Sequence, residues 1–158
     1  MFIEVIVLDI QNISIDTLVN GYELQEDHYE CLFCGASFGL DEVFQHEGRF
    51  FTAEGMMKLH IGQIHISPFH ALLSLDKKVT GLSDVQVEML QYFFEGSSDQ
   101  EIVGKSSLTS VSTVRQHRFK LREKEKQAKI FIALMQLMKK PEHYAIHKGA
   151  RQVDERYS

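Results

Sequence analysis

The chain has 158 residues, of which 44% are hydrophobic and 25% are charged, as is usual for a globular protein of one or two small domains. It contains no apolar run near the roughly 20 residues that a membrane span needs. The N-terminal segment MFIEVIVLDI carries acids where a signal peptide carries a basic flank, and two cysteines cannot make a disulfide scaffold. These features exclude a membrane channel and a secreted disulfide-rich protein, and they predict a cytoplasmic one.

The net charge of −5 hides a strong asymmetry. Residues 1–110 contain 5 Lys/Arg against 17 Asp/Glu, whereas residues 111–129 contain 7 Lys/Arg against 2 Glu. Local clusters of Lys and Arg determine nucleic-acid affinity, because each neutralised phosphate releases counterions. The basic stretch is therefore a candidate nucleic-acid contact, with a solvated helix face as the alternative.

Four segments are predicted along the chain. A short helix is expected in the first, from Ser14 to Val19, closed by Gly21. Pro141 is expected to end the helical region. The segments are a leader over 1–28, a metal-binding module over 29–75, a helical domain over 76–141 and a polar tail over 142–158.

The second segment carries two paired motifs. Cys31 and Cys34 form C-x2-C, the spacing of a turn that brings two thiolates to one ion. His60 and His65 form H-x4-H on a helix predicted over residues 53–65, so that their imidazoles lie about one turn apart. Thr52 is the expected N-cap of that helix, and the four side chains are candidate metal ligands.

The order strand, C-x2-C, strand, helix, H-x4-H resembles a Cys2His2 zinc finger. The resemblance implies a structural Zn²⁺, with Phe38 and Met57 in the core of a ββα module. Such fingers have about 12 residues between the second Cys and the first His, whereas this chain has 25, and the extra residues predict an additional hairpin.

Other interpretations of the cysteines stay open. In one alternative, the two cysteines are reduced and buried, and the histidines only pack against them. In another, they form a redox dithiol, although no βαβ pattern surrounds them. His46, inside the insertion, is the reserve metal ligand. The predicted helix offers only Lys58 against Glu54 in acidic surroundings, so we do not expect this module to read DNA.

Three short helices are predicted after residue 82. Ser83 with Gln86, and Ser98 with Glu101, match capping boxes at the starts of two of them. Gly104, in the polar break that follows, is able to form a left-handed turn, and a third, basic helix begins near residue 110. Three helices ending in a basic one are the layout of a helix-turn-helix domain, and a plain helical bundle is the alternative.

The stretch GLSDVQVEMLQYFFEGSSDQEIV resembles the start of a LuxR-type helix-turn-helix, and SVSTVRQH (residues 110–117) is similar to that family's S-x-x-T-V-K-x-H. The region TSVSTVRQHRFKLREKEKQAKIFIALMQLM and the ending IHKGARQVDERY resemble a group of bacterial transcription regulators that carry C-x2-C and paired histidines ahead of these helices. Longer members continue into a further domain that this chain is expected to lack. One extra residue between Glu101 and Thr113 predicts a different turn.

The resemblance implies an α+β, mostly α fold: a small ββα zinc-finger-like module followed by a LuxR-like helix-turn-helix domain. It also implies a nucleoid-associated regulator of transcription that binds double-stranded DNA. Residue by residue, the implied DNA contacts are Ser110, Thr113, Arg115, His117, Arg118, Lys120, Arg122 and Lys124.

No Gly or Pro lies between residues 111 and 140, which predicts that the basic helix continues into the last one, residues 130–140. The last helix is apolar nearly all round, so we expect it to be buried in its own core or against a partner. A seven-residue repeat predicts a pairing seam or a core stripe at Val114, Leu121, Ala128 and Met135. Since LuxR-type domains commonly dimerise through this helix, the resemblance implies a homodimer held by Phe131, Leu134, Met135 and Met138.

No phosphate-binding loop, H-E-x-x-H or G-x-S-x-G motif is present in the sequence, and no small-molecule substrate is evident. We therefore do not predict an enzyme; the nearest enzymatic interpretation is a ββα-metal nuclease that uses His46. The alternative function is a protein adaptor that uses the metal module and the apolar last helix, because DNA would repel the acidic N-terminal part.

Overall fold

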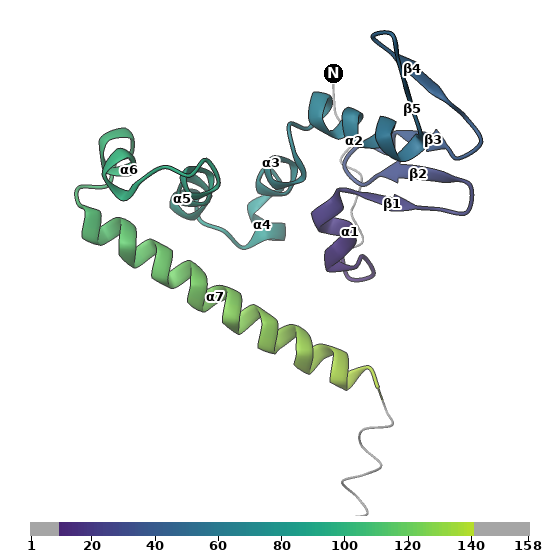
Figure 1. Cartoon of the computed structure of the whole chain (residues 1–158). Coiled ribbons are helices and arrows are strands. Elements are labelled where there is room, and N and C mark those ends of the chain that lie inside the picture. The colour runs from purple at the N-terminus through teal and green to yellow at the C-terminus, as the bar shows by residue number, and fades with distance from the viewer. Residues whose placement is uncertain (1–9, 141–158) are drawn as a thin grey trace, which may run out of the picture. The chain divides into compact units, whose positions relative to one another are not determined.

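Figure 1 shows the computed structural model, which describes residues 10–140. The fold is α+β, with two small antiparallel sheets and seven helices among the described residues. The predicted tail at 142–158 lies outside this range. The chain divides between Leu82 and Ser83 into two compact units, which are described separately.

The first unit starts with a short helix and two small sheets. Its elements are α1 (Ile15–Asn20), β1 (Tyr22–Leu24), β2 (His28–Cys31), β3 (Ser37–Gly39), β4 (Phe44–His46), β5 (Arg49–Phe51), α2 (Ala53–Ile64), α3 (Pro68–Leu73) and α4 (Lys77–Thr80). The second unit contains α5 (Asp84–Phe94), α6 (Asp99–Lys105) and α7 (Val111–Met138).

The predicted leader contributes to the first sheet as well as forming its helix. Ser14 is the N-cap of α1, and Gly21 closes the helix at φ 81°, where the sequence predicts its end. The strand order of the sheet is β1-β2-β3, and Tyr22 pairs with Cys31 across β1 and β2. The predicted ββα module therefore gains a third strand, because Tyr22 also packs on the core formed by Cys31, Met57 and Ile61.

The predicted extra hairpin is confirmed as β4 and β5, in which Phe44 pairs with Phe51. Its two turn residues, Glu47 and Gly48, both have positive φ (48° and 77°). That conformation matches the twist of a tight two-residue hairpin. The insertion is thus a local addition that leaves the sheet of β1, β2 and β3 intact.

The second unit closes around one fully buried residue from each helix: Met89 of α5, Ile102 of α6 and Val114 of α7. Both predicted capping boxes are present at the starts of α5 and α6. Gly104 does not use its ability to form a left-handed turn, because it lies inside α6, which continues to Lys105. A glycine permits such a turn but does not impose one.

The basic and apolar predicted helices are one continuous helix, α7, of 28 residues. The expectation that its apolar end is buried in its own core is wrong, since Ile130, Phe131 and Leu134 are each more than half exposed. The seven-residue repeat is a core stripe only in its first half: Val114 is buried and Leu121 packs on the core, whereas Ala128 and Met135 are exposed. No helix within residues 10–140 has the length and apolar character to cross a membrane.

The backbone conformation of Ile66, in the first unit, is strained. Ile66 has a φ of 67° directly after His65, and its side chain is 70% exposed. The left-handed conformation costs an L-residue roughly 1–2 kcal/mol, and a β-branched residue is an outlier there. The chain needs this turn to leave α2 and enter α3.

We predict that Ile66→Asn raises the free energy of unfolding by about 1 kcal/mol, because asparagine tolerates the left-handed region and little buried surface is lost. Chemical denaturation measures the change. Ile64→Asn is the matched control, since Ile64 is similarly exposed but ends a helix with ordinary dihedrals. If Ile66→Asn is no more stable than wild type, the backbone at position 66 is not strained.

Candidate metal centre and nucleic-acid face

The two cysteines lie at a tight turn between β2 and β3. Cys31 ends β2, its N–H donates to Ala36 O (2.8 Å), and its own carbonyl accepts from Gly35 N–H (2.9 Å). Gly35 takes a φ of 73°, which closes the turn. Cys34 lies within this turn, so both sulfur atoms are presented at one end of the strand pair.

The two histidines come from the C-terminal part of α2. Thr52 caps this helix through a hydrogen bond from Gly55 N–H, as predicted. Met57, fully buried, fixes the helix against the sheet. His60 lies in the last turns and His65 is the C-cap residue, and their ring centroids are 5.3 Å apart.

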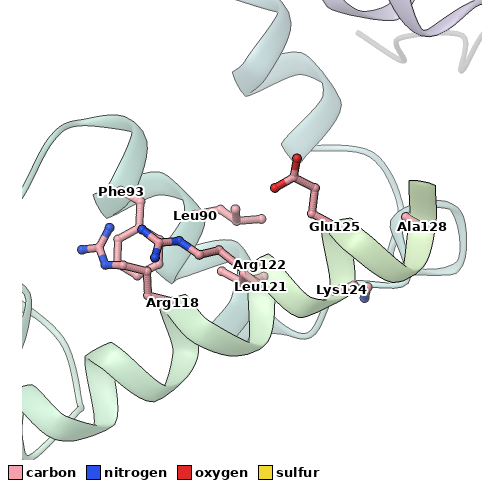
Figure 2. A pocket seen from close by; sticks show the side chains of 8 residues that line it. All are labelled: Leu90, Phe93, Arg118, Leu121, Arg122, Lys124, Glu125 and Ala128. Atoms are coloured by element: carbon pink, nitrogen blue, oxygen red, sulfur yellow. The ribbon is translucent and has the colours of Figure 1, made fainter. Parts of the chain in front are cut away.

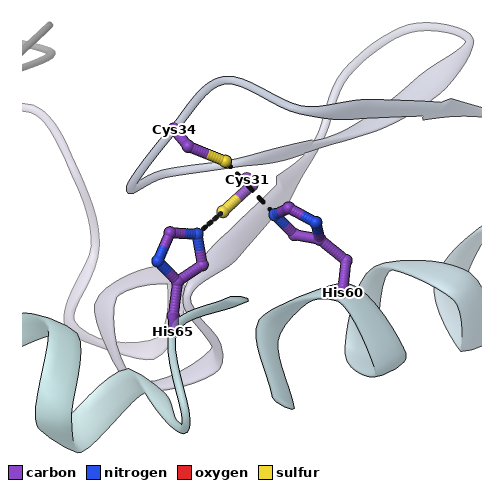
Figure 3. Close-up of side chains that lie close together, drawn as sticks. All are labelled: Cys31, Cys34, His60 and His65. Carbon is purple, nitrogen blue, oxygen red and sulfur yellow. Dashed lines mark hydrogen bonds between the residues drawn. The ribbon is translucent and has the colours of Figure 1, made fainter. Parts of the chain in front are cut away.

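The four predicted ligands converge in space (Figure 3). Cys31 Sγ lies 3.5 Å from His65 Nε2, and Cys34 Sγ lies 3.2 Å from His60 Nε2. All four donor atoms lie within 4.8 Å of one another. Ligands of a tetrahedral ion with bonds near 2.0–2.3 Å are separated by about 3.5 Å. The four side chains are therefore positioned to bind a metal ion.

Burial shifts the pKa values of both histidines and of Cys31. It favours the neutral form of both histidines, which is the form that binds a metal, and it opposes ionisation of the Cys31 thiol. It lowers the pKa of both His60 and His65, and repulsion from a protonated His65 would lower that of His60 further, so protonation of the two rings is disfavoured. Desolvation raises the pKa of Cys31 above its usual value. A metal ion that binds there must displace the thiol proton, so binding is coupled to proton release.

The reserve ligand His46 does not join this cluster. Its Nε2 lies 3.2 Å from Gln63 Nε2, which ties the β4–β5 hairpin to α2. Both cysteines are free thiols, and a histidine nitrogen lies close to each sulfur. A plain redox dithiol would not need two imidazoles at that distance, so the geometry favours a metal ligand set.

The predicted DNA-contact residues lie on the N-terminal half of α7. Ser110 caps the helix by accepting from Thr113 N–H (3.2 Å), and Val114 packs into the core. This contact fixes which face of the helix points away from α5 and α6. The structure leaves Arg115, Lys120, Arg122 and Lys124 exposed, whereas Ser110, Thr113, His117 and Arg118 are half-buried.

Arg118 is held within the unit rather than pointing straight outward. Its guanidinium lies 3.9 Å from the centroid of the Phe93 ring and 2.9 Å from Asp99 Oδ1. Arg115 Nε donates to the same carboxylate at 3.3 Å. The hydrogen bond from Arg118 is the main reason that the pKa of Asp99 is lowered. Arg118 therefore also joins α7 to α5 and α6.

A shallow groove of about 440 Å³ runs between α5 and α7 beside Arg118 (Figure 2). Its apolar walls come from both helices, and charged side chains of α7 line its rim. Glu125 on this rim pairs with Lys129 (2.8 Å), so the basic side chains dominate. The lining residues are Leu90, Phe93, Arg118, Leu121, Arg122, Lys124, Glu125 and Ala128.

The outward face of α7 includes two exposed side chains that do not belong to the predicted DNA-contact set. Gln116 and Phe119 lie on the side opposite the buried Val114, and Phe119 is 63% exposed. Ser112 and Lys120 are exposed beside them. The sequence already indicates this face, since the apolar residues Val114 and Leu121, seven positions apart, define the opposite side of the helix.

The C-terminal part of α7 is an exposed apolar surface, here called the apolar end and defined as residues 130–138. The predicted dimer residues belong to it, and each is at least 40% exposed. Those residues are Phe131, Leu134, Met135 and Met138.

No protein-family model, curated protein or solved structure matches this chain.

For the metal centre, we predict one bound ion per chain in wild type and loss of that ion in Cys34→Ser and His60→Ala, because three ligands bind far less tightly than four. Elemental analysis of the purified protein measures the stoichiometry. His46→Ala is the matched histidine control and keeps the ion. Full metal retention in both ligand variants, or loss in the control, contradicts the assignment.

Proposed function

We propose that this chain is a Zn²⁺-containing, homodimeric regulator of transcription that binds double-stranded DNA with the N-terminal half of α7. The observation that carries the proposal is the packing of α5, α6 and α7 around Met89, Ile102 and Val114. This packing leaves the outer side of a basic helix exposed, as a helix that enters the major groove requires. A protein with this role would be associated with the nucleoid, in the cytoplasm.

Charge supports this role. Residues 111–129 contain 7 Lys/Arg and 2 Glu, and the structure leaves most of these side chains on the surface of one rigid helix. Glu123 and Glu125 are paired with Lys126 (2.6 Å) and Lys129 (2.8 Å). The net positive potential of this part of α7 would attract phosphates.

Zn²⁺ is the metal that suits the donor set. Two thiolates and two imidazoles are a usual structural zinc set, and four protein ligands complete a tetrahedron without an open position for substrate. Within residues 10–82, the buried hydrophobic core, apart from Ala53, is only Cys31, Met57 and Ile61. A bound ion would therefore supply much of the unit's folding free energy.

A second copy of the chain is the proposed partner of the apolar end. Ile130, Leu134 and Leu137 recur at the alternating spacing of four and three residues typical of paired helices, and each is at least 48% exposed. An exposed apolar surface of this kind marks an interaction site. Pairing would bring two basic half-helices to one DNA molecule.

The protein adaptor remains a second candidate, favoured by the same exposed apolar end and by the acidic first 110 residues. In that role the apolar end contacts a different protein and the basic half of α7 has no nucleic-acid partner. Duplex DNA binding separates the two functions.

We predict that wild type binds a randomised DNA duplex at about 50 mM salt and weakens steeply by about 200 mM. Replacing Lys120 and Lys124 together by Gln lowers the slope of log affinity against log salt by about 2. Electrophoretic shifts over a salt series measure it. The matched control replaces Lys58 and Lys78 of the first unit by Gln and keeps the slope. No binding at low salt favours the adaptor.

We predict that Leu134→Asp converts a dimer into a monomer, because it places a charge in the proposed seam. Sedimentation equilibrium at micromolar concentration measures the molar mass of wild type and of the variant. Val79→Asp in α4 is the control, since Val79 has a similar exposure outside the apolar end. A wild type that is already monomeric at that concentration contradicts the proposed dimer.

A further inference from the structure

The outward face of the N-terminal half of α7 combines an exposed amide with an exposed aromatic ring. Gln116 and Phe119 are three residues apart, which places them as neighbours on one face. Phe119 is 63% exposed although it is a large apolar residue in an otherwise polar stretch. Neither the core of the second unit nor the groove between α5 and α7 uses these two side chains.

The surroundings leave both side chains accessible. The arginines nearest to them turn to the flank of the helix, where Arg115 and Arg118 meet Asp99. Glu123, one turn further along the same face, pairs with Lys126. Within residues 10–140, the exposed Gln116 side chain forms no hydrogen bond, so its donor and acceptor groups face solvent.

These two side chains have distinct preferences among base edges. A glutamine amide makes a bidentate pair with N6 and N7 of adenine in the major groove. An aromatic ring has no hydrogen-bonding group to offer, but it contacts the C5-methyl group of thymine. The guanidinium and ammonium groups that favour guanine lie beside them, on the flanks of the helix.

We propose that Gln116 and Phe119 read A·T pairs in the major groove, with adenine recognised by the Gln116 amide and the thymine methyl group by the Phe119 ring. The inference rests on the proposed DNA-binding function and names its sequence preference. Three residues advance a helix by about 4.5 Å, slightly more than the ~3.4 Å between base pairs. The two contacts therefore fall one or two base pairs apart.

The test uses the full metal-loaded chain and a randomised duplex pool. Selected sequences are expected to share an adenine and a nearby thymine in each half-site. Gln116→Ala then loses the preference for adenine, by about fivefold to a hundredfold. Phe119→Ala loses the preference for thymine, by about fourfold, the contribution of one buried methyl group.

Modified bases locate each contact. Uracil in place of the selected thymine lacks only the methyl group, so it weakens wild type and leaves Phe119→Ala unchanged. The base 7-deazaadenine lacks the N7 acceptor, so it weakens wild type and leaves Gln116→Ala unchanged. Gln127→Ala and Phe94→Ala are matched controls, since both side chains are exposed elsewhere in the second unit, and they keep both preferences.

Two failures are distinguishable. If wild type binds DNA with the expected salt dependence but both variants weaken all sequences equally, or if the selected site lacks A·T pairs, the inference is overturned and the proposed function stands. If wild type binds no duplex at low salt, the proposed function fails and the inference fails with it.

Discussion

The contact of Val114 with Met89 and Ile102 is the constraint on which the second unit depends. All three side chains are fully buried, and each comes from a different helix. Because a helix has a fixed period, burying one residue of α7 determines which of its neighbours face outward. The ion pair of Arg118 with Asp99, beside the Phe93 ring, reinforces the same orientation. The exposed basic face is thus a consequence of core packing.

The first unit follows a different principle, in which a small core is combined with a set of metal-binding side chains. Cys31 belongs to both, since it is buried against Met57 and its sulfur faces His65. Loss of a metal ion from this site would therefore weaken the packing of α2 on the sheet. Under the proposed function, this unit contributes stability, and the second unit contributes the contact with DNA.

Local signals in the sequence were enough to predict much of the fold. The capping boxes, the turn at Gly21, the hairpin inserted between the ligand pairs and the convergence of Cys31, Cys34, His60 and His65 all depend on residues close in sequence or on a known ligand spacing. Strand β1 was not predicted, because its three residues are too few to show an alternating pattern, although it pairs with the neighbouring β2. The position of Arg118 was also beyond a motif comparison, since Phe93 and Asp99 come from other helices.

We propose that the N-terminal half of α7 is the surface that meets DNA. It is tested most directly by backbone amide NMR spectra of the isotope-labelled full chain, recorded while a duplex that carries the selected site is added. Our account predicts that the largest shifts cluster in residues 110–124, with little change in residues 28–65. Shifts concentrated around the metal ligands, or none at saturating duplex, would contradict it.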